Sequence, residues 1–208
     1  MKTNRAYRES PSQTAGPYVH IGLTPNFSGV GSVYPYDLGS LPVDQAARGE
    51  RIAIEGLVLD GAEVPLKDAL LEIWQADAAG IYPSPADPRS GADPSFKGWA
   101  RSPTHMTTGL YRFETVKPGC VPFKDGRLMA PHITFWIVAR GINMGLQTRL
   151  YFADETTANA EDPVLARIEH RERVQTLIAQ RADQQSDMPL YRFDIRLQGP
   201  SETVFFDI

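Results

Sequence analysis

The stretch that decides the fold reads A-P-H-I-T-F-W-I-V-A-R and covers residues 130–140. Its apolar and mixed positions alternate, and side chains two residues apart share one face of a β-strand. One face is wholly apolar and carries Ile133, Phe135, Ile137 and Ala139. The other face is mixed and carries His132, Thr134, Trp136, Val138 and Arg140. The stretch therefore predicts a strand that packs one face into a core.

Runs of the same kind recur along the chain, separated by turns. They cover residues 51–60, 69–76, 109–116, 147–153, 190–197 and 203–208. Short strands at this spacing, rich in β-branched and aromatic residues, are typical of a β-sandwich. We expect an all-β fold, namely an antiparallel β-sandwich with long loops and one or two short helices.

One helix is predicted within residues 155–170, where Asp162 suits the N-cap and Pro163 suits the first helical turn. Two continuations are open for residues 176–181. They can extend this helix, or they can pair with residues 190–197 as a hairpin, and we favour the hairpin.

Composition restricts the class of protein. The hydrophobic content of 42% and the charged content of 22% are ordinary for a globular chain of 208 residues. The net charge of -4 gives no reason to expect nucleic acid as a partner. No apolar run approaches a membrane span, and one cysteine, Cys120, excludes an internal disulfide. We expect one cytoplasmic domain over residues 1–208, with an extended N-terminal arm and loops in residues 1–50 and a sandwich core in residues 51–208.

Histidine is the first candidate for chemistry. Two histidines at i and i+2 lie roughly 7 Å apart on one face of a strand and can share a metal ion. Here His132 is followed by Thr134 at that spacing. His20, His105 and His170 also lack a second histidine, cysteine or carboxylate at a metal-binding spacing. Each histidine, taken alone, is expected to have a structural role.

Other catalytic signatures are absent from the sequence. No G-x-S-x-G, H-E-x-x-H or phosphate-binding glycine loop occurs, and Cys120 has no local sign of activation. Arg140 and Arg149 bracket a glycine-rich bend, where an arginine can meet an anion, although a solvated or salt-bridged arginine is the more common outcome. The residues alone predict a β-rich domain with a small anion as one candidate ligand.

Several longer motifs carry a resemblance to a known family. They run in order from residue 11 to 207 and read P-S-Q-T-A-G-P-Y-V-H-I-G-L, L-E-I-W-Q-A-D-A-A-G-I-Y, T-V-K-P-G, A-P-H-I-T-F, A-R-G-I-N, T-R-L-Y-F, D-P-V-L, Y-R-F-D-I-R-L-Q-G and E-T-V-F-F-D. In these motifs the chain resembles the intradiol ring-cleavage dioxygenases. The run A-R-G-I-N and the E-T-V-F-F-D ending resemble the alpha-type chains of that family. The resemblance implies the family's β-sandwich core, a partner beta chain of similar fold, and a higher oligomer of alpha–beta heterodimers.

The resemblance also implies where iron is held. Iron-binding chains of the family hold Fe(III) with two tyrosines and two histidines, and the matching positions here are Tyr82, Val121, His132 and Thr134. Valine has no donor atom, and a neutral threonine hydroxyl is a poor replacement for imidazole at ferric iron. The expectation is that this chain binds no metal and has no catalytic residue of its own. The Fe(III) is then held by the beta subunit.

The chain's contribution is expected at the interface with the beta subunit. In the family the T-x-G-P-Y turn of the alpha chain helps to wall the active site, and here it is Thr14, Gly16, Pro17 and Tyr18. Arg140 is a further candidate for that cavity, where its charge could assist a carboxylate substrate. It lies about 26 Å along a straight strand from His132, so it cannot serve the positions around His132 and would be used only in a site shared with another chain. The reaction implied is cleavage of 3,4-dihydroxybenzoate by O₂ to 3-carboxy-cis,cis-muconate. Two rival functions are a self-sufficient intradiol catechol dioxygenase and a non-catalytic β-sandwich binding module.

Overall fold

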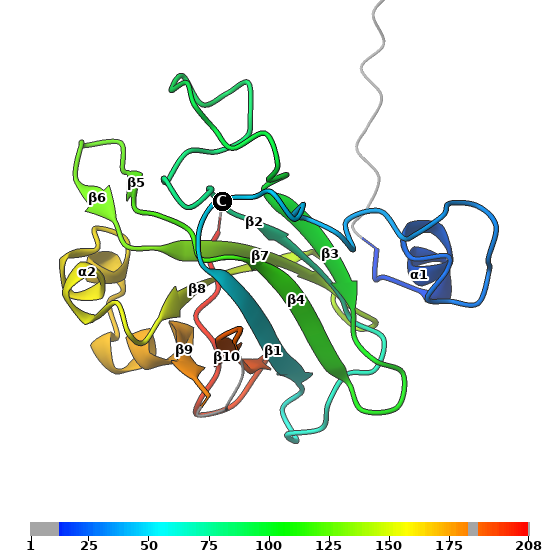
Figure 1. Ribbon diagram of the computed structural model, residues 1–208. Coiled ribbons are helices and arrows are strands. Elements are labelled where there is room, and N and C mark those ends of the chain that lie inside the picture. Colours follow the sequence, from blue (N-terminus) through cyan, green and yellow to red (C-terminus); the bar gives the residue numbers. More distant parts are fainter. Residues whose placement is uncertain (1–12, 183–186, 208) are drawn as a thin grey trace, which may run out of the picture.

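The computed structural model describes residues 13–182 and 187–207 (Figure 1). The chain is mostly sheet with few helices, as the strand-like runs predict. Within these residues, no helix has the length and apolar character that a membrane crossing requires.

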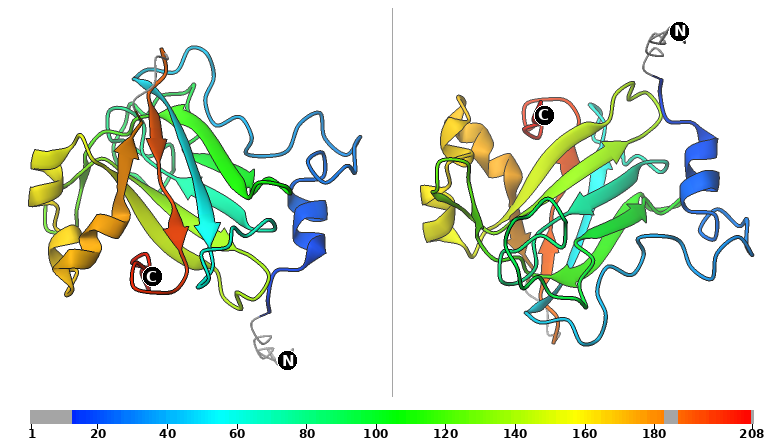
Figure 2. Two further views of the ribbon diagram at one scale, coloured as in Figure 1. Left: turned by 90° about the horizontal axis from the view of Figure 1, so that it is seen from below. Right: turned by 90° about the horizontal axis from the view of Figure 1, so that it is seen from above.

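The strands follow the predicted runs closely in most places. They are β1 Arg51–Leu59, β2 Leu70–Trp74, β3 Trp99–Pro103, β4 Leu110–Val116, β5 Val121–Pro122, β6 Leu128–Met129, β7 His132–Val138, β8 Leu146–Phe152, β9 Ile178–Arg181, β10 Leu190–Arg192 and β11 Ile195–Arg196. The helical elements are α1 Pro17–Leu23 and α2 Thr156–Glu161, with 3₁₀ turns η1 Leu165–Arg167 and η2 Arg171–Leu177. In Figures 1 and 2, α1 and α2 lie at opposite ends of the molecule.

The main sheet is mixed rather than antiparallel. Its order is β11-β1-β10-β9-β8-β7-β2-β3, with β4 paired to β1, and β5 and β6 form a separate hairpin. The expected antiparallel pairing is wrong for β1 with β10, β1 with β11, and β8 with β9, which are parallel. Parallel neighbours need a long crossover, and the chain between β8 and β9 supplies one through α2, η1 and η2.

The predicted apolar face of β7 is confirmed as core. Its side chains Ile133, Phe135, Ile137 and Ala139 are fully buried. The Phe135 ring meets Phe113 edge-on, with centroids 5.8 Å apart. Burying side chains of this size contributes about 1.5–3 kcal/mol each. The strand chosen from the alternation is therefore the centre of the hydrophobic core.

The hairpin is confirmed, whereas the helix is only partly right. β9 and β10 pair antiparallel, with Tyr191 opposite Arg181. α2 ends at Glu161 with Asp162 as its C-cap, and the chain continues as 3₁₀ turns because Pro163 has no N–H to extend the helix. Asp162 still acts as a cap, since its buried carboxylate accepts hydrogen bonds from the backbone N–H groups of Val164 and Leu165.

One strand prediction is wrong, and one helix and three strands were missed. The run after Gly16 is the helix α1, because Pro17 occupies its first turn and presets the backbone. Residues 203–207 form no strand, since they bond singly to two different strands through Thr203 to Arg196 and Phe206 to Gln147, and residue 208 lies outside the described residues. β5 and β6 have two residues each, and β3, W-A-R-S-P, escaped prediction because its buried face carries only the small side chains of Ala100 and Ser102.

Candidate functional site

The first candidate site is a cavity of about 320 Å³ beside α1, here called the N-terminal pocket. Its walls include Gly16, Pro17, Asp68 and Arg140. The structure thus brings together residues that are more than a hundred positions apart in the sequence. Two residues of the predicted turn line the same cavity as the predicted arginine.

Thr14 connects the turn to the end of β7. Its hydroxyl donates a hydrogen bond to the Ala139 carbonyl oxygen at 3.3 Å and accepts one from the Gly141 N–H at 2.7 Å. These two bonds hold the backbone on either side of Arg140. The position of Arg140 relative to the turn is therefore set by Thr14.

Arg140 is held by a carboxylate while remaining largely exposed. Both its Nε and an Nη nitrogen lie 2.7 Å from Asp68 Oδ2, and the Arg140 side chain is 75% exposed. His20 Nε2 lies 3.0 Å from the backbone carbonyl oxygen of the same Asp68. The pair orients the guanidinium without covering it, so the outer N–H groups remain available to an anion.

The surface next to this pocket is apolar. Tyr18 is 84% exposed, and further exposed apolar side chains follow it closely in the sequence: Ile21, Val30, Val33, Tyr34, Tyr36, Leu38 and Leu41. These residues, with Tyr18, are called the N-terminal apolar surface. Large apolar side chains gathered on one exposed segment mark an interaction site. The prediction of an extended arm and loops over residues 1–50 missed this feature, although the valines, tyrosines and leucines between the glycines signalled it.

The positions that match the family's iron ligands lie in another region, here called the ligand-position cluster and made up of Tyr82, Val121, His132 and Thr134. The Tyr82 ring stacks on Trp74, with centroids 5.8 Å apart and planes at 8°. Val121 is buried in a small core against which Tyr82 packs. Thr134 pairs across the sheet with Trp74, two residues along β7 from His132. The fold therefore does gather these positions.

His132 is buried, with 2% of its surface exposed. Its Nδ1 lies 2.7 Å from the Ala130 carbonyl oxygen, so this nitrogen carries the hydrogen and donates. Its Nε2 has no hydrogen-bond partner among the described residues. Burial, together with the positive charge of Arg149, lowers the pKa of His132 to about 4. The imidazole is therefore neutral at pH 7 and presents a buried lone pair.

Arg149 brings a positive charge into the cluster. It stands opposite Thr134 on β8, and its Nη1 lies 3.5 Å from both the Tyr151 hydroxyl and the Met129 sulfur. Burial raises the pKa of Tyr82, and the positive charge of Arg149 acts against that shift. A fixed cation thus lies among the positions that the resemblance assigns to metal ligands.

These residues do not fit a ferric ion. Val121 offers no donor, Thr134 offers a neutral hydroxyl, and the guanidinium of Arg149 repels a cation. Over residues 13–182 and 187–207, no group of three or more His, Cys, Asp or Glu side chains is arranged to hold a metal. We therefore derive no reaction step from iron bound to this chain.

A family model described as Dioxygenase matches residues 24–199. The chain therefore belongs to this dioxygenase family of oxidoreductases. It is 45% identical over 199 residues to the protocatechuate 3,4-dioxygenase alpha chain of Pseudomonas putida, with 96% of each chain covered. It is 44% identical over 207 residues to that of Burkholderia cepacia, covering 97% of this chain and 98% of the relative.

Two further similarities concern the partner chain and the fold. The chain is 33% identical over 160 residues to the protocatechuate 3,4-dioxygenase beta chain of Burkholderia cepacia, covering 74% of this chain and 67% of the other. An intradiol ring-cleavage dioxygenase from Tetranychus urticae superposes with a TM-score of 0.57 at 21% identity, covering 91% of this chain and 94% of that one. The solved structure supports the mostly-sheet fold.

Proposed function

We propose that this chain is the alpha subunit of a protocatechuate 3,4-dioxygenase. It completes the active site of a beta subunit that holds Fe(III) and cleaves 3,4-dihydroxybenzoate with O₂ to 3-carboxy-cis,cis-muconate. Similarity to alpha chains over nearly the whole length supports this function, and similarity to a beta chain supports the pairing.

One observation carries the proposal. The cation of Arg149 lies at the ligand-position cluster, whereas the N-terminal pocket presents an exposed arginine, and Tyr18 is exposed on the helix α1 whose first residue lines that pocket. A chain that lacks the donors for iron and yet displays a pocket fit for an anion is suited to complete the site of another chain. This distribution opposes the rival of a self-sufficient catechol dioxygenase.

The N-terminal apolar surface is the proposed contact with the beta subunit. Interfaces that persist are enriched in tyrosine and other large apolar side chains, as this surface is.

The proposal also includes a single domain over residues 1–208, with residues 1–50 as the arm and residues 51–208 as a two-layer sandwich. In it, heterodimers assemble into a higher oligomer in the cytoplasm.

Each residue of the turn has a physical task in this proposal. Apart from its two chain neighbours, a Cβ at Gly16 would meet no atom of residues 13–182 and 187–207 within 4 Å, so the backbone there is open to a partner or a substrate. Pro17 fixes the chain direction at the start of α1. Tyr18 offers a ring and a hydroxyl, and Arg140 attracts the substrate carboxylate.

These residues bind, orient and exclude water. Ferric iron held by the partner would supply a site that the catecholate chelates and that makes it reactive toward O₂. The chain described here then acts through position and charge. No proton transfer is assigned to it.

Purification of the chain alone and with a beta chain tests the proposal. The chain alone is expected to contain no stoichiometric iron and to cleave no substrate, whereas the co-purified complex contains iron and cleaves it. Stoichiometric iron with the visible absorption of a ferric tyrosinate in the chain alone would establish the self-sufficient enzyme instead. A chain that neither binds the beta subunit nor alters its turnover would be a binding module.

A further inference from the structure

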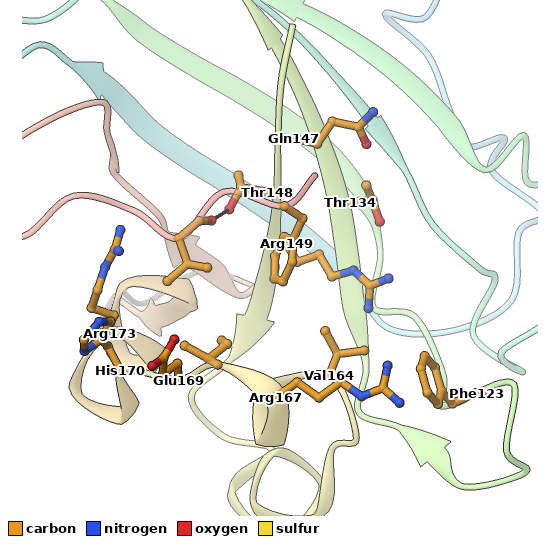
Figure 3. Close-up of a pocket in the computed structure, with 13 residues that line it drawn as sticks. Phe123, Thr134, Gln147, Thr148, Arg149, Val164, Arg167, Glu169, His170 and Arg173 are labelled. Carbon is orange, nitrogen blue, oxygen red and sulfur yellow. Dashed lines mark hydrogen bonds between the residues drawn. The ribbon is translucent and has the colours of Figure 1, made fainter. Parts of the chain in front are cut away.

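A larger cavity lies at the other end of the molecule, between β7, β8 and the turns that follow α2 (Figure 3). Its volume is about 450 Å³, and we call it the arginine pocket. The residues that matter for its chemistry are Arg149, Arg167, Phe123, Phe206 and Thr134. In Figure 3 the guanidinium groups of Arg149 and Arg167 point to the same side of the cavity, next to Phe123.

The charge of the pocket is not balanced by the described residues. Arg173, also in the wall, pairs with Glu202 at 3.1 Å. Arg149 and Arg167 have no carboxylate within ion-pair distance in residues 13–182 and 187–207. The one carboxylate in the described wall is that of Glu169. In a chain of net charge -4, this is a local excess of positive charge.

Arg149 is the more informative of the two cations. It is half-buried, and its contacts in the described structure are weak ones to a sulfur and a phenol oxygen at 3.5 Å. A partly desolvated guanidinium without a counter-charge is costly, and an anion that reaches it recovers that cost. The arrangement therefore favours an anionic ligand.

The apolar walls restrict the kind of anion. The guanidinium of Arg167 lies 4.8 Å from the Phe123 ring centroid, and that of Arg149 lies 5.8 Å from the Phe206 centroid. Val164, Ile168 and Val204 complete the apolar lining. A small inorganic anion would leave these walls uncovered, whereas a flat ring that carries a carboxylate would cover them. Cavities of this size commonly hold one small molecule.

We propose that the arginine pocket binds a small aromatic carboxylate. The carboxylate pairs with Arg149 and Arg167, and the ring lies between Phe123 and Phe206. The hydroxyl of Thr134 is in reach of a polar substituent on the ring. This inference goes beyond the proposed function, which places the reacting substrate beside the N-terminal pocket.

The test is calorimetric titration of the full chain with benzoate, with cyclohexylmethanol and inorganic phosphate as comparison ligands. Benzoate is expected to bind once per chain, and neither the neutral alcohol nor phosphate is expected to compete. The Arg149→Gln and Arg167→Gln variants should each weaken benzoate binding by about tenfold or more. Arg167 is exposed, so its variant keeps the fold and remains interpretable.

Arg48→Gln is the matched control, because Arg48 is an exposed arginine that lines neither the arginine pocket nor the N-terminal pocket. It should leave the benzoate affinity within about twofold of the unaltered chain. The inference is overturned if benzoate does not bind, if phosphate binds as well as benzoate, or if Arg48→Gln weakens binding as much as Arg149→Gln does. Ring cleavage by the complex is assayed separately, so loss of cleavage with intact benzoate binding contradicts the proposed function alone.

Discussion

The N-terminal pocket and the ligand-position cluster use the same kinds of residue in opposite ways. Around the pocket, Tyr18 and Arg140 are exposed, and one hydroxyl and one carboxylate hold the backbone and the guanidinium in place. In the cluster, Tyr82 stacks on a tryptophan and His132 is buried with one nitrogen unpartnered. The first region is arranged for contact with something outside the chain. In the second region, Tyr82 and His132 are occupied by contacts within the chain.

The comparison predicts that stability depends on the cluster's surroundings, whereas activity depends on the N-terminal pocket. The buried carboxylate of Asp162 gives the largest expected effect, because it accepts hydrogen bonds from the N–H groups of Ala130, Val164 and Leu165 at 2.7–2.8 Å. Asp162→Ala leaves all three donors unsatisfied and should lower the free energy of unfolding by about 3–5 kcal/mol, measured by urea denaturation.

Asp60→Ala is the control for that prediction. Asp60 accepts hydrogen bonds from the N–H groups of Ala62 and Val64, but in an exposed turn where water can replace it. Its loss should cost about 1 kcal/mol or less. Equal effects of the two substitutions would show that the turn beside the cluster is no more important than a surface turn.

His132 gives the next largest expected effect, which is a dependence of the free energy of unfolding on pH. Its pKa is lowered to about 4 in the folded chain, against about 6.5 when unfolded. The unfolded chain therefore binds more protons between these values, and the free energy of unfolding falls as pH falls below 6.5. Between pH 7 and pH 5 the loss should be about 2 kcal/mol.

The measurement is urea denaturation at both pH values for the unaltered chain and for His132→Gln. The variant should show a smaller loss between pH 7 and pH 5, by about that amount. Identical pH dependence in the two proteins would mean that His132 is protonated to the same extent folded and unfolded.

Tyr18 tests the prediction that activity, rather than stability, depends on the region of the N-terminal pocket. Since its side chain is 84% exposed, Tyr18→Ala should leave the free energy of unfolding of the chain within about 0.5 kcal/mol. In the complex with a beta chain, the same change should lower kcat/KM about tenfold, which corresponds to about 1.4 kcal/mol. Tyr18→Phe separates the ring from the hydroxyl. An unchanged kcat/KM for Tyr18→Ala would remove this residue from the cavity wall.

The smallest expected effect belongs to the Asp68–Arg140 pair. Exposed ion pairs contribute little, so Asp68→Asn should change the free energy of unfolding by less than about 0.5 kcal/mol, and less still at high salt. Chemical denaturation at two salt concentrations measures it. A loss comparable to that for Asp162→Ala would show that the N-terminal pocket is part of the stabilising core after all.

The sequence predicted the structure best for β7, where the pattern within one strand is enough to identify the buried face. The alternation in β7 indicated the core face correctly, because Ile133, Phe135 and Ile137 leave only one way to bury that face. It could not reveal that β1 pairs in parallel with β10 and β11, since those pairings depend on segments far along the chain. The helix α1 was not predicted, although Pro17 at its first turn is a signal for a helix start.

The candidate sites also divide into features that the sequence predicts and features that depend on distant segments. Arg140 and Arg149 were seen as two ends of one bend, but the fold sends them to different pockets. Arg140 lines the same pocket as Gly16 and Pro17. The position of Arg149 beside His132 depends on the register between β7 and β8, which spacing along the sequence does not give.

The placement of β1 also affects how the chain folds during synthesis. β1 and β4 form a local antiparallel pair, but the other edge of β1 is covered only by β10 and β11, close to the end of the chain. Until the ribosome has released those segments, a long apolar strand keeps one row of backbone hydrogen-bonding groups open to neighbours. A chain cut short before residue 190 would therefore leave that edge free to aggregate. Prompt synthesis of β10 and β11 therefore protects the chain from aggregation.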